Sequence, residues 1–210
     1  MRRHERRVVV VVVSVAILTV TVLAVIGAID RRQSMRRSSV PPRDDDAIEA
    51  RVTIERRIGD VFSFYRDFRN LPRFLGDVSA IEPMDGATSR WTILGPLGVR
   101  VHWTVKVTEE DANELIRYET VSSPKLRTYW EIHFSPGSEA GQTEVREVMR
   151  TPLGPVGRAA LALIGKFPLQ EMRSNLHRLK EVMETGSVSD TSYSVAGKFA
   201  LPPNRGASEK

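Results

Sequence analysis

The chain has 210 residues and no cysteine, which excludes disulfides, thiol nucleophiles and thiolate metal sites. Its 31 lysine and arginine side chains exceed its 26 aspartate and glutamate side chains, a basic balance that can indicate nucleic-acid binding. Residues 47–184, however, carry 19 basic and 19 acidic side chains, so the excess lies in the terminal segments and we expect no nucleic-acid partner.

The first feature along the chain is an uncharged stretch of 22 residues, 8–29. As a helix it would be about 33 Å long, enough to cross a hydrocarbon core of about 30 Å. A secretory signal peptide is the alternative, but its apolar region is usually about 7–15 residues long, and the sequence around Ala28 is a poor cleavage site. We therefore expect residues 1–29 to form a basic flank and a single membrane-spanning helix. Four arginines before the span and five after it leave the orientation open.

Residues 30–46 are rich in arginine and aspartate and contain two prolines, which predicts a disordered linker. Residues 47–58 then alternate between apolar and polar side chains, which predicts a strand with one covered face. Apolar residues spaced by three and four between positions 61 and 75 predict two short helices, with Asp60 as a helix cap and a division near Asn70 and Pro72.

A series of strands separated by turn signals follows, and strands joined by short turns favour an antiparallel meander. The clearest strand is 99–107, where valines and Trp103 alternate with polar residues. Residues 109–113 are polar and are expected to form a turn. The strands are predicted at 79–84, 90–94, 99–107, 115–121, 126–134 and 143–150.

The last predicted element is a helix that begins at Pro168 and ends by Gly186. Its apolar residues recur at three and four positions and form one stripe, while Arg178 lies off that stripe. The stripe consists of Leu169, Met172, Leu176, Leu179 and Met183. Residues 187–210 contain much serine, glycine and proline and are predicted to be a disordered tail.

Four short motifs resemble one known family. They are FYRDFRNLPRF at 64–74, Arg90-Trp91, GQTEV at 141–145 and METG at 183–186. With the order of elements, they are similar to the SRPBCC (START-like) superfamily, in its bacterial polyketide cyclase/dehydrase and coenzyme Q-binding branch, over residues 47–186. The resemblance implies an α+β helix-grip fold, in which a curved antiparallel sheet wraps around a long C-terminal helix and encloses an apolar cavity.

Strand alternation and the helical stripe together give the residues expected to line that cavity, although each of them could equally fill an ordinary core. They are Trp91, Val101, Trp103, Tyr118, Trp130, Ile132, Phe134, Glu147, Met149, Met172, Leu176 and Leu179. Among the aromatic residues, Tyr118 and Tyr65 could orient a ligand, or could place their hydroxyl groups at the rim of the core.

Glu147 is the one ionisable residue that strict alternation points inward, because Val145 and Met149 flank it on the same face. In an apolar cavity its pKa would be raised, and the group could hydrogen-bond a ligand carbonyl or hydroxyl. The alternative is a local bulge that turns Glu147 to solvent, towards Arg146 or Arg127. The four histidines show no metal-ligand spacing, so we assign no metal, no cofactor and no catalytic residue.

The leading functional hypothesis is a membrane-tethered module that binds or transfers a hydrophobic small molecule, such as a lipid, a quinone or a polyketide-like compound. Its partners would be that ligand and membrane lipid, and its location a bacterial cell membrane. The first alternative is a polyketide cyclase or dehydratase-type enzyme, for which Glu147 would move protons. The second is a non-catalytic partner of a membrane complex, with the cavity collapsed. The sequence does not determine the oligomeric state.

Overall fold

The computed structural model describes residues 47–94, 99–121, 127–151, 167–195 and 198–199. The elements are β1 (Ile48–Ile54), α2 (Ile58–Arg66), the 3-10 helix η2 (Phe68–Arg73), β2 (Val78–Pro83), β3 (Thr88–Leu94), β4 (Arg100–Asp111), β5 (Leu115–Thr120), β6 (Tyr129–Pro136), β7 (Thr143–Arg150) and α4 (Pro168–Thr185). Within these ranges, none of the helices combines the length and the apolar character that crossing a membrane requires. The span predicted at 8–29 and the linker at 30–46 lie outside the described residues.

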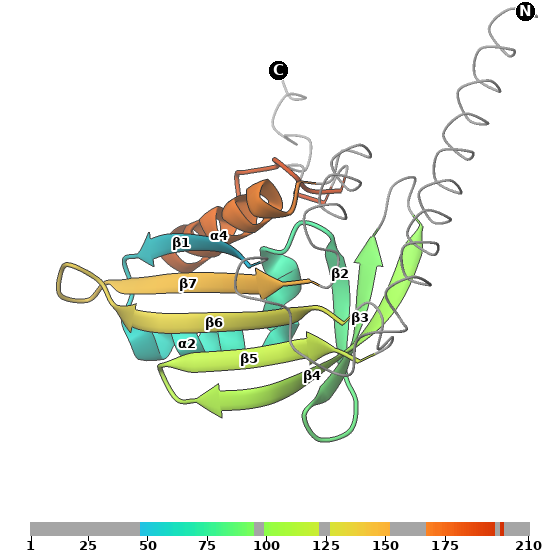
Figure 1. The fold of residues 1–210 in the computed structure, drawn as a ribbon. Helices are drawn as coiled ribbons and strands as arrows, with labels where there is room; N and C mark the ends of the chain where they lie inside the picture. Colours follow the sequence, from blue (N-terminus) through green and yellow to red (C-terminus); the bar gives the residue numbers. More distant parts are fainter. Residues whose placement is uncertain (1–46, 95–98, 122–126, 152–166, 196–197, 200–210) are drawn as a thin grey trace, which may run out of the picture.

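All seven strands form one antiparallel sheet in the order β1-β7-β6-β5-β4-β3-β2. Strands β2 to β7 follow one another as a meander, and its last strand, β7, pairs with β1, the first strand of the chain (Figure 1). Helix α4 packs beside β1, and α2 lies behind the middle strands, so both helices cover the same side of the sheet. The α+β helix-grip fold, with its sheet packed on the C-terminal helix, is thereby confirmed.

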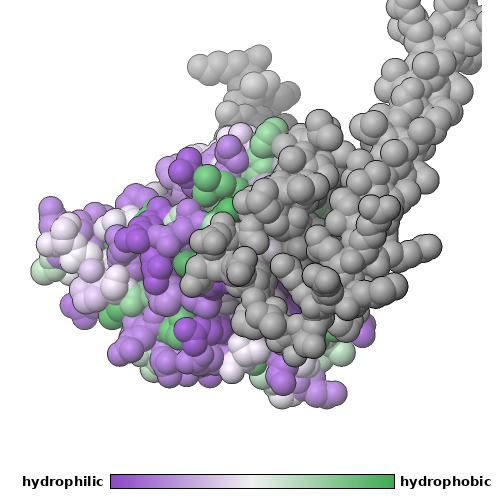
Figure 2. Space-filling model, viewed as in Figure 1, coloured by the Kyte–Doolittle hydropathy of each residue, from purple (hydrophilic) through white to green (hydrophobic). Residues whose placement is uncertain are grey.

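The other side of the sheet carries the charged residues, as period-two alternation requires. Figure 2 shows this side as a largely hydrophilic surface. Its charges pair across neighbouring strands: Arg146 contacts Glu49 at 3.2 Å, and Arg150 contacts Glu131 at 2.8 Å. Because alternation places the charged side chains on this face, the apolar side chains of the same strands lie on the opposite face.

Several predicted boundaries differ from the structure: β1 ends at Ile54 rather than at residue 58, and β6 runs from Tyr129 to Pro136 rather than over 126–134. Strand β4 continues through Asp111, and the turn is confined to the residues around Asn113, whose φ of 65° is one that asparagine tolerates. The two short helices divide at Asp67 rather than near Asn70, since the Asp67 side chain accepts a hydrogen bond from the Arg69 backbone N–H. Asp60 does not cap α2; it lies in the first turn, where its charge favours the helix N-terminus.

Helix α4 begins and ends where the sequence predicts. Pro168 occupies the first turn, and Gly186 ends the helix in the left-handed conformation with φ of 83°. The expected stripe supplies the buried contacts of Met172, Leu176 and Leu179. Arg178 lies off this stripe, and its side chain is nevertheless 0% exposed.

Residues after α4 explain why Arg178 is buried, and they differ from the predicted disordered tail. Residues 187–195 and 198–199 fold back over α4 and over the loop between η2 and β2. The Val195 backbone N–H donates to the Gly76 carbonyl at 3.1 Å, and the Arg178 guanidinium donates to the Ser192 carbonyl at 2.6 Å. The C-terminal boundary of the folded unit therefore lies beyond residue 186.

Candidate functional site

The strand residues predicted to line a cavity share the helix-covered face of the sheet, and the predicted residues of α4 belong to the helix that packs on it. The structure places these residues in three degrees of burial. Two are exposed, Val101 at 43% and Trp103 at 37%. Trp130 and Met149 are partly buried. The others are buried: Trp91, Tyr118, Ile132, Phe134, Glu147, Met172, Leu176 and Leu179.

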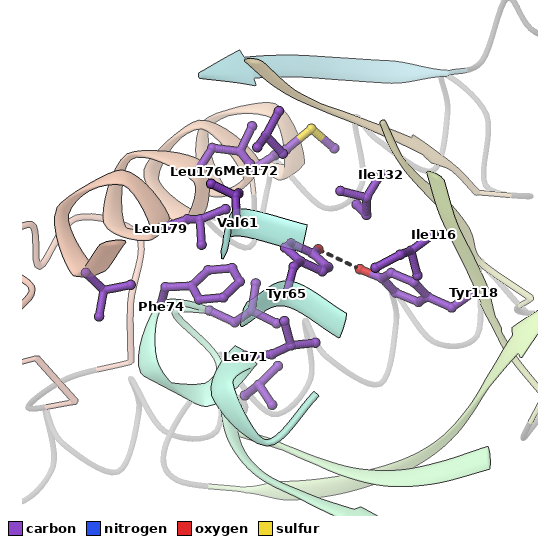
Figure 3. Close-up of a cluster of buried hydrophobic side chains, with 14 of the residues drawn as sticks. Val61, Tyr65, Leu71, Phe74, Ile116, Tyr118, Ile132, Met172, Leu176 and Leu179 are labelled. Carbon is purple, nitrogen blue, oxygen red and sulfur yellow. Dashed lines mark hydrogen bonds between the residues drawn. The ribbon is translucent and has the colours of Figure 1, made fainter. Parts of the chain in front are cut away.

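Next to α4, the inner face is a packed core. Figure 3 shows Leu176 and Leu179 of α4 facing Val61, Tyr65 and Phe74 of the α2–η2 region. All five of these side chains are essentially inaccessible to solvent. This part of the expected cavity is therefore occupied by the protein's own side chains, held together by the burial of apolar surface.

Further along β4, the described side chains on the same face become exposed. Val105 is fully buried, yet Trp103 and Val101, which alternation places on the same side, are exposed. In register, Trp103 lies opposite Trp91 of β3, which is buried. Among the described residues, the apolar face thus continues from the core to the end of the sheet where β3 ends and β4 and β6 begin, which we call the open end.

A group of four aromatic rings connects the core with this open end. Tyr118 stacks on Trp130 with ring centroids 5.2 Å apart, and Trp91 lies 5.8 Å from Tyr118. Phe68 contacts both Tyr118 and Trp91 edge-on, at 5.3 and 5.6 Å. The sequence reasoning did not include Phe68 in the site, although its place in the aromatic motif of residues 64–74 was a usable signal.

Phe68 also belongs to a cleft that the sequence did not predict. The cleft has a volume of about 420 Å³ and lies between η2 and strands β2, β3 and β4. Its apolar lining includes Phe68, Ile81 and Val107, and its rim includes Arg66 and Arg69. Both arginines form ion pairs with nearby carboxylates, so the cleft offers an apolar surface with a balanced rim.

Two tyrosine hydroxyl groups form the polar centre of the interior. Tyr65 of α2 and Tyr118 of β5 hydrogen-bond each other through their oxygens at 3.2 Å (Figure 3). Burial raises the pKa of each well above its ordinary value, so both remain neutral at physiological pH. The hydroxyl groups are therefore enclosed, rather than placed at the rim of the core.

Glu147 faces the interior with the tyrosines, and the alternative of a bulge towards solvent does not hold. The residue is 6% exposed, and the β7 register is continuous on both sides, with Ala50 and Ile132 as its neighbours. Burial raises its pKa from 4.5 to about 8, and its charge in turn raises the pKa of Tyr65 and Tyr118. At neutral pH the carboxyl group is protonated, and it can both donate and accept a hydrogen bond.

The described histidines lie away from this centre. His102 on β4 is 3.3 Å from the Thr92 hydroxyl, and His133 on β6 is 3.4 Å from Glu131, both on the polar side of the sheet. Burial lowers the pKa of His133. His177 on α4 lies 3.8 Å from Glu181. Across the described residues, no three histidine, aspartate or glutamate side chains gather as metal ligands would.

Comparison with known proteins agrees with this geometry. No curated protein matches the chain. Among solved structures, it is similar to DR_A0006 of Deinococcus radiodurans, with 25% identity and a TM-score of 0.52 over 67% of this chain and 98% of that one. It is also similar to TTHA0849 of Thermus thermophilus, with 23% identity and a TM-score of 0.53 over 67% and 99%.

A START superfamily protein of Mycobacterium smegmatis shares 13% identity, with a TM-score of 0.51 over 67% of this chain and 99% of that one, which supports the fold alone. The family described as polyketide cyclase / dehydrase and lipid transport matches residues 46–184. That match covers most of the chain and the described strands and helices from β1 to α4, apart from the last residue of α4. The chain therefore belongs to the polyketide cyclase / dehydrase and lipid transport family.

Proposed function

We propose that this protein binds a hydrophobic small molecule, such as a lipid, a quinone or a polyketide-like compound, at the open end of its sheet. The observation that carries the proposal is the change along the inner face of β4, from a fully buried Val105 to the exposed Trp103 and Val101. Apolar side chains on a core-facing surface that the core does not cover are typical of a binding site. Membership of a family that includes lipid-transport proteins supports this choice of ligand.

Apolar burial would supply the affinity. Covering about 300 Å² of ligand and protein surface is worth about 7 kcal/mol before the cost of lost ligand freedom, at about 25 cal/mol per Å². The aromatic rings of Trp103 and Trp130 add flat contact surface for a ring or an extended chain. A membrane helix at residues 8–29 would hold this surface near its source of apolar ligand and raise the effective concentration there.

The test measures binding of N-phenyl-1-naphthylamine, a neutral apolar fluorophore, to the full chain and to Trp103→Glu and Val101→Glu variants. Because each substitution places a charge on the proposed surface, we expect the affinity to fall about tenfold or more. Met84→Glu is the matched control, since Met84 is equally exposed at 43% but follows β2 at the other end of the sheet. Equal affinities in all four proteins, with no apolar molecule co-purifying, would exclude the proposal.

An enzymatic function is the second candidate, and Glu147 is the observation that favours it. A buried carboxyl group with a pKa near neutrality is suited to proton transfer in a cyclase or dehydratase reaction. This candidate requires turnover of a poly-β-ketone substrate that Glu147→Gln abolishes. Binding that survives that substitution, without any turnover in the unaltered chain, would favour the binding module.

A further inference from the structure

Glu147 has the least explained environment of the buried polar residues. It lies between Ala50 and Ile132 in register, and it makes no hydrogen bond or ion pair with any residue that the structure describes. Tyr65 and Tyr118, whose hydroxyl groups lie in the same interior, bond each other. A buried carboxyl group without a protein partner costs stability, and an aliphatic residue at this position would avoid that cost.

We propose that Glu147 and the Tyr65–Tyr118 hydroxyl pair form the polar recognition point of the ligand site, and that they select neutral molecules with a carbonyl oxygen. This inference depends on the proposed function, since it names the chemical class of the hydrophobic ligand. The hydrogen-bond partner of Glu147 is then the carbonyl oxygen of the ligand.

The hydrogens available at this centre determine the class of ligand. One tyrosine hydroxyl donates to the other, so the hydrogen of the accepting tyrosine is free for a further bond. The protonated Glu147 carboxyl offers a second O–H. A carbonyl oxygen has two lone pairs and no hydrogen of its own, so it can accept from both donors at once.

Anionic headgroups do not suit this centre, because no cation faces it among the described residues. The arginines of β7, Arg146 and Arg150, pair with carboxylates on the opposite face of the sheet. On α4, the Arg178 guanidinium is bonded to the Phe74 carbonyl, and Lys180 Nζ to the Thr53 carbonyl. A carboxylate or phosphate would enter this apolar region unpaired, at a large desolvation cost.

The same neighbours define the pH dependence. Tyr65 of α2 and Tyr118 of β5 are the titratable groups that face Glu147, while β1, β6 and α4 present apolar side chains such as Ala50, Ile132 and Leu176. Both tyrosines stay protonated, so among the groups that face this centre Glu147 alone changes charge between pH 6.5 and 9. Its deprotonation removes one donor and places a negative charge beside the carbonyl oxygen.

The test compares dodecan-2-one, labelled with carbon-13 at the carbonyl, with dodecane and dodecanoate as probes of the full chain. At pH 6.5 we expect the ketone to bind about tenfold more tightly than dodecane, which corresponds to one or two buried hydrogen bonds. The carbonyl resonance should move downfield on binding, and the preference should disappear at pH 9. Dodecanoate should bind no better than dodecane.

Variants separate the recognition point from the apolar site. Glu147→Leu removes one of the two donors, so it should weaken the preference for the ketone over the alkane, reduce the carbonyl shift, and make both independent of pH between 6.5 and 9. Glu147→Gln keeps a neutral donor, so it should retain the preference at pH 6.5 and also at pH 9. Glu144→Gln is the matched control, because Glu144 lies on the outer face of β7 and pairs with Arg51. It should behave as the unaltered chain does.

Two outcomes would contradict the inference in different ways. Equal binding of ketone and alkane by the unaltered chain, without a carbonyl shift, would overturn the recognition point and leave the hydrophobic site intact. Binding of none of the three probes would overturn the proposed function, and the recognition point with it. If Glu147→Leu does not fold, the pH series on the unaltered chain and on Glu147→Gln decides.

Discussion

Two buried ionisable residues, Arg178 and Glu147, have opposite surroundings: among the described residues, the first has hydrogen-bond partners and the second has none. Arg178 is enclosed by the polypeptide, and each of its three guanidinium nitrogens donates to an acceptor of the protein. Glu147 is almost as deeply buried, but apolar side chains surround it and no described residue bonds it. The difference indicates that Arg178 stabilises the fold, whereas Glu147 is available to bind a group that the fold itself does not supply.

The region around Arg178 joins three distant parts of the chain. Its guanidinium donates to the Phe74 carbonyl at 2.8 Å, to the Ser192 carbonyl at 2.6 Å and to the Asn175 side chain at 2.6 Å. Lys198 adds hydrogen bonds to the Leu75 carbonyl in the η2–β2 loop and to the Val78 carbonyl at the start of β2. Burial lowers the pKa of Lys198 to about 8, which shows how far this region is removed from water.

The largest effect is expected from Arg178→Met. The substitution keeps much of the side-chain volume but leaves the buried Phe74 carbonyl and the part-buried Ser192 carbonyl without the Arg178 donor, and it removes one of the two donors to the Asn175 amide oxygen. We expect the free energy of unfolding to fall by about 3–5 kcal/mol, measured by urea denaturation. Arg173→Met is the control, because Arg173 is on the same helix but exposed, and it should change stability by less than about 0.5 kcal/mol. Equal effects of the two substitutions would mean that the tail does not enclose Arg178.

Glu147→Gln is expected to raise the free energy of unfolding, by an amount that depends on pH. The folded state keeps the Glu147 proton up to about pH 8, whereas the unfolded state releases it near pH 4.5. Folding is therefore penalised increasingly as the pH rises through this window, by about 1.4 kcal/mol per unit at most. Between pH 5 and 7.5 the unaltered chain should lose about 3 kcal/mol relative to the variant. Parallel stability curves for the two proteins would place the Glu147 carboxyl in contact with water.

The sheet and α4 could be predicted from sequence because their signals are local. Alternation over β4 and apolar spacing over α4 follow directly from the strand and helix periods. Pro168 and Gly186 mark the two ends of α4 through their backbone preferences alone. These features require no knowledge of distant residues, and the structure confirms them.

The surroundings of the two buried charges could not be predicted in the same way. Arg178 is satisfied by backbone carbonyls at Phe74 and Ser192, and backbone groups leave no trace in residue type. For Glu147, alternation gave the direction, but its burial depended on a continuous register with β1 and β6. The packed core beside α4 could not be predicted either, because it depends on the volume of side chains from distant residues. Tyr65 and Phe74 of the α2–η2 region fill the space that was expected to be hollow.

The smallest change in stability is expected at the Tyr65–Tyr118 pair. Its hydrogen bonding is intermediate between that of Arg178 and that of Glu147, because the two hydroxyl groups bond each other but leave one hydrogen free. Tyr118→Phe should cost about 1–2 kcal/mol, since it leaves the buried Tyr65 hydroxyl without its partner. The double substitution with Tyr65→Phe should cost less than the sum of the two single ones, by about 1 kcal/mol. Urea denaturation of the four proteins measures this coupling. Strict additivity would mean that each hydroxyl has another partner, and then no free tyrosine hydrogen would remain for a ligand carbonyl beside Glu147.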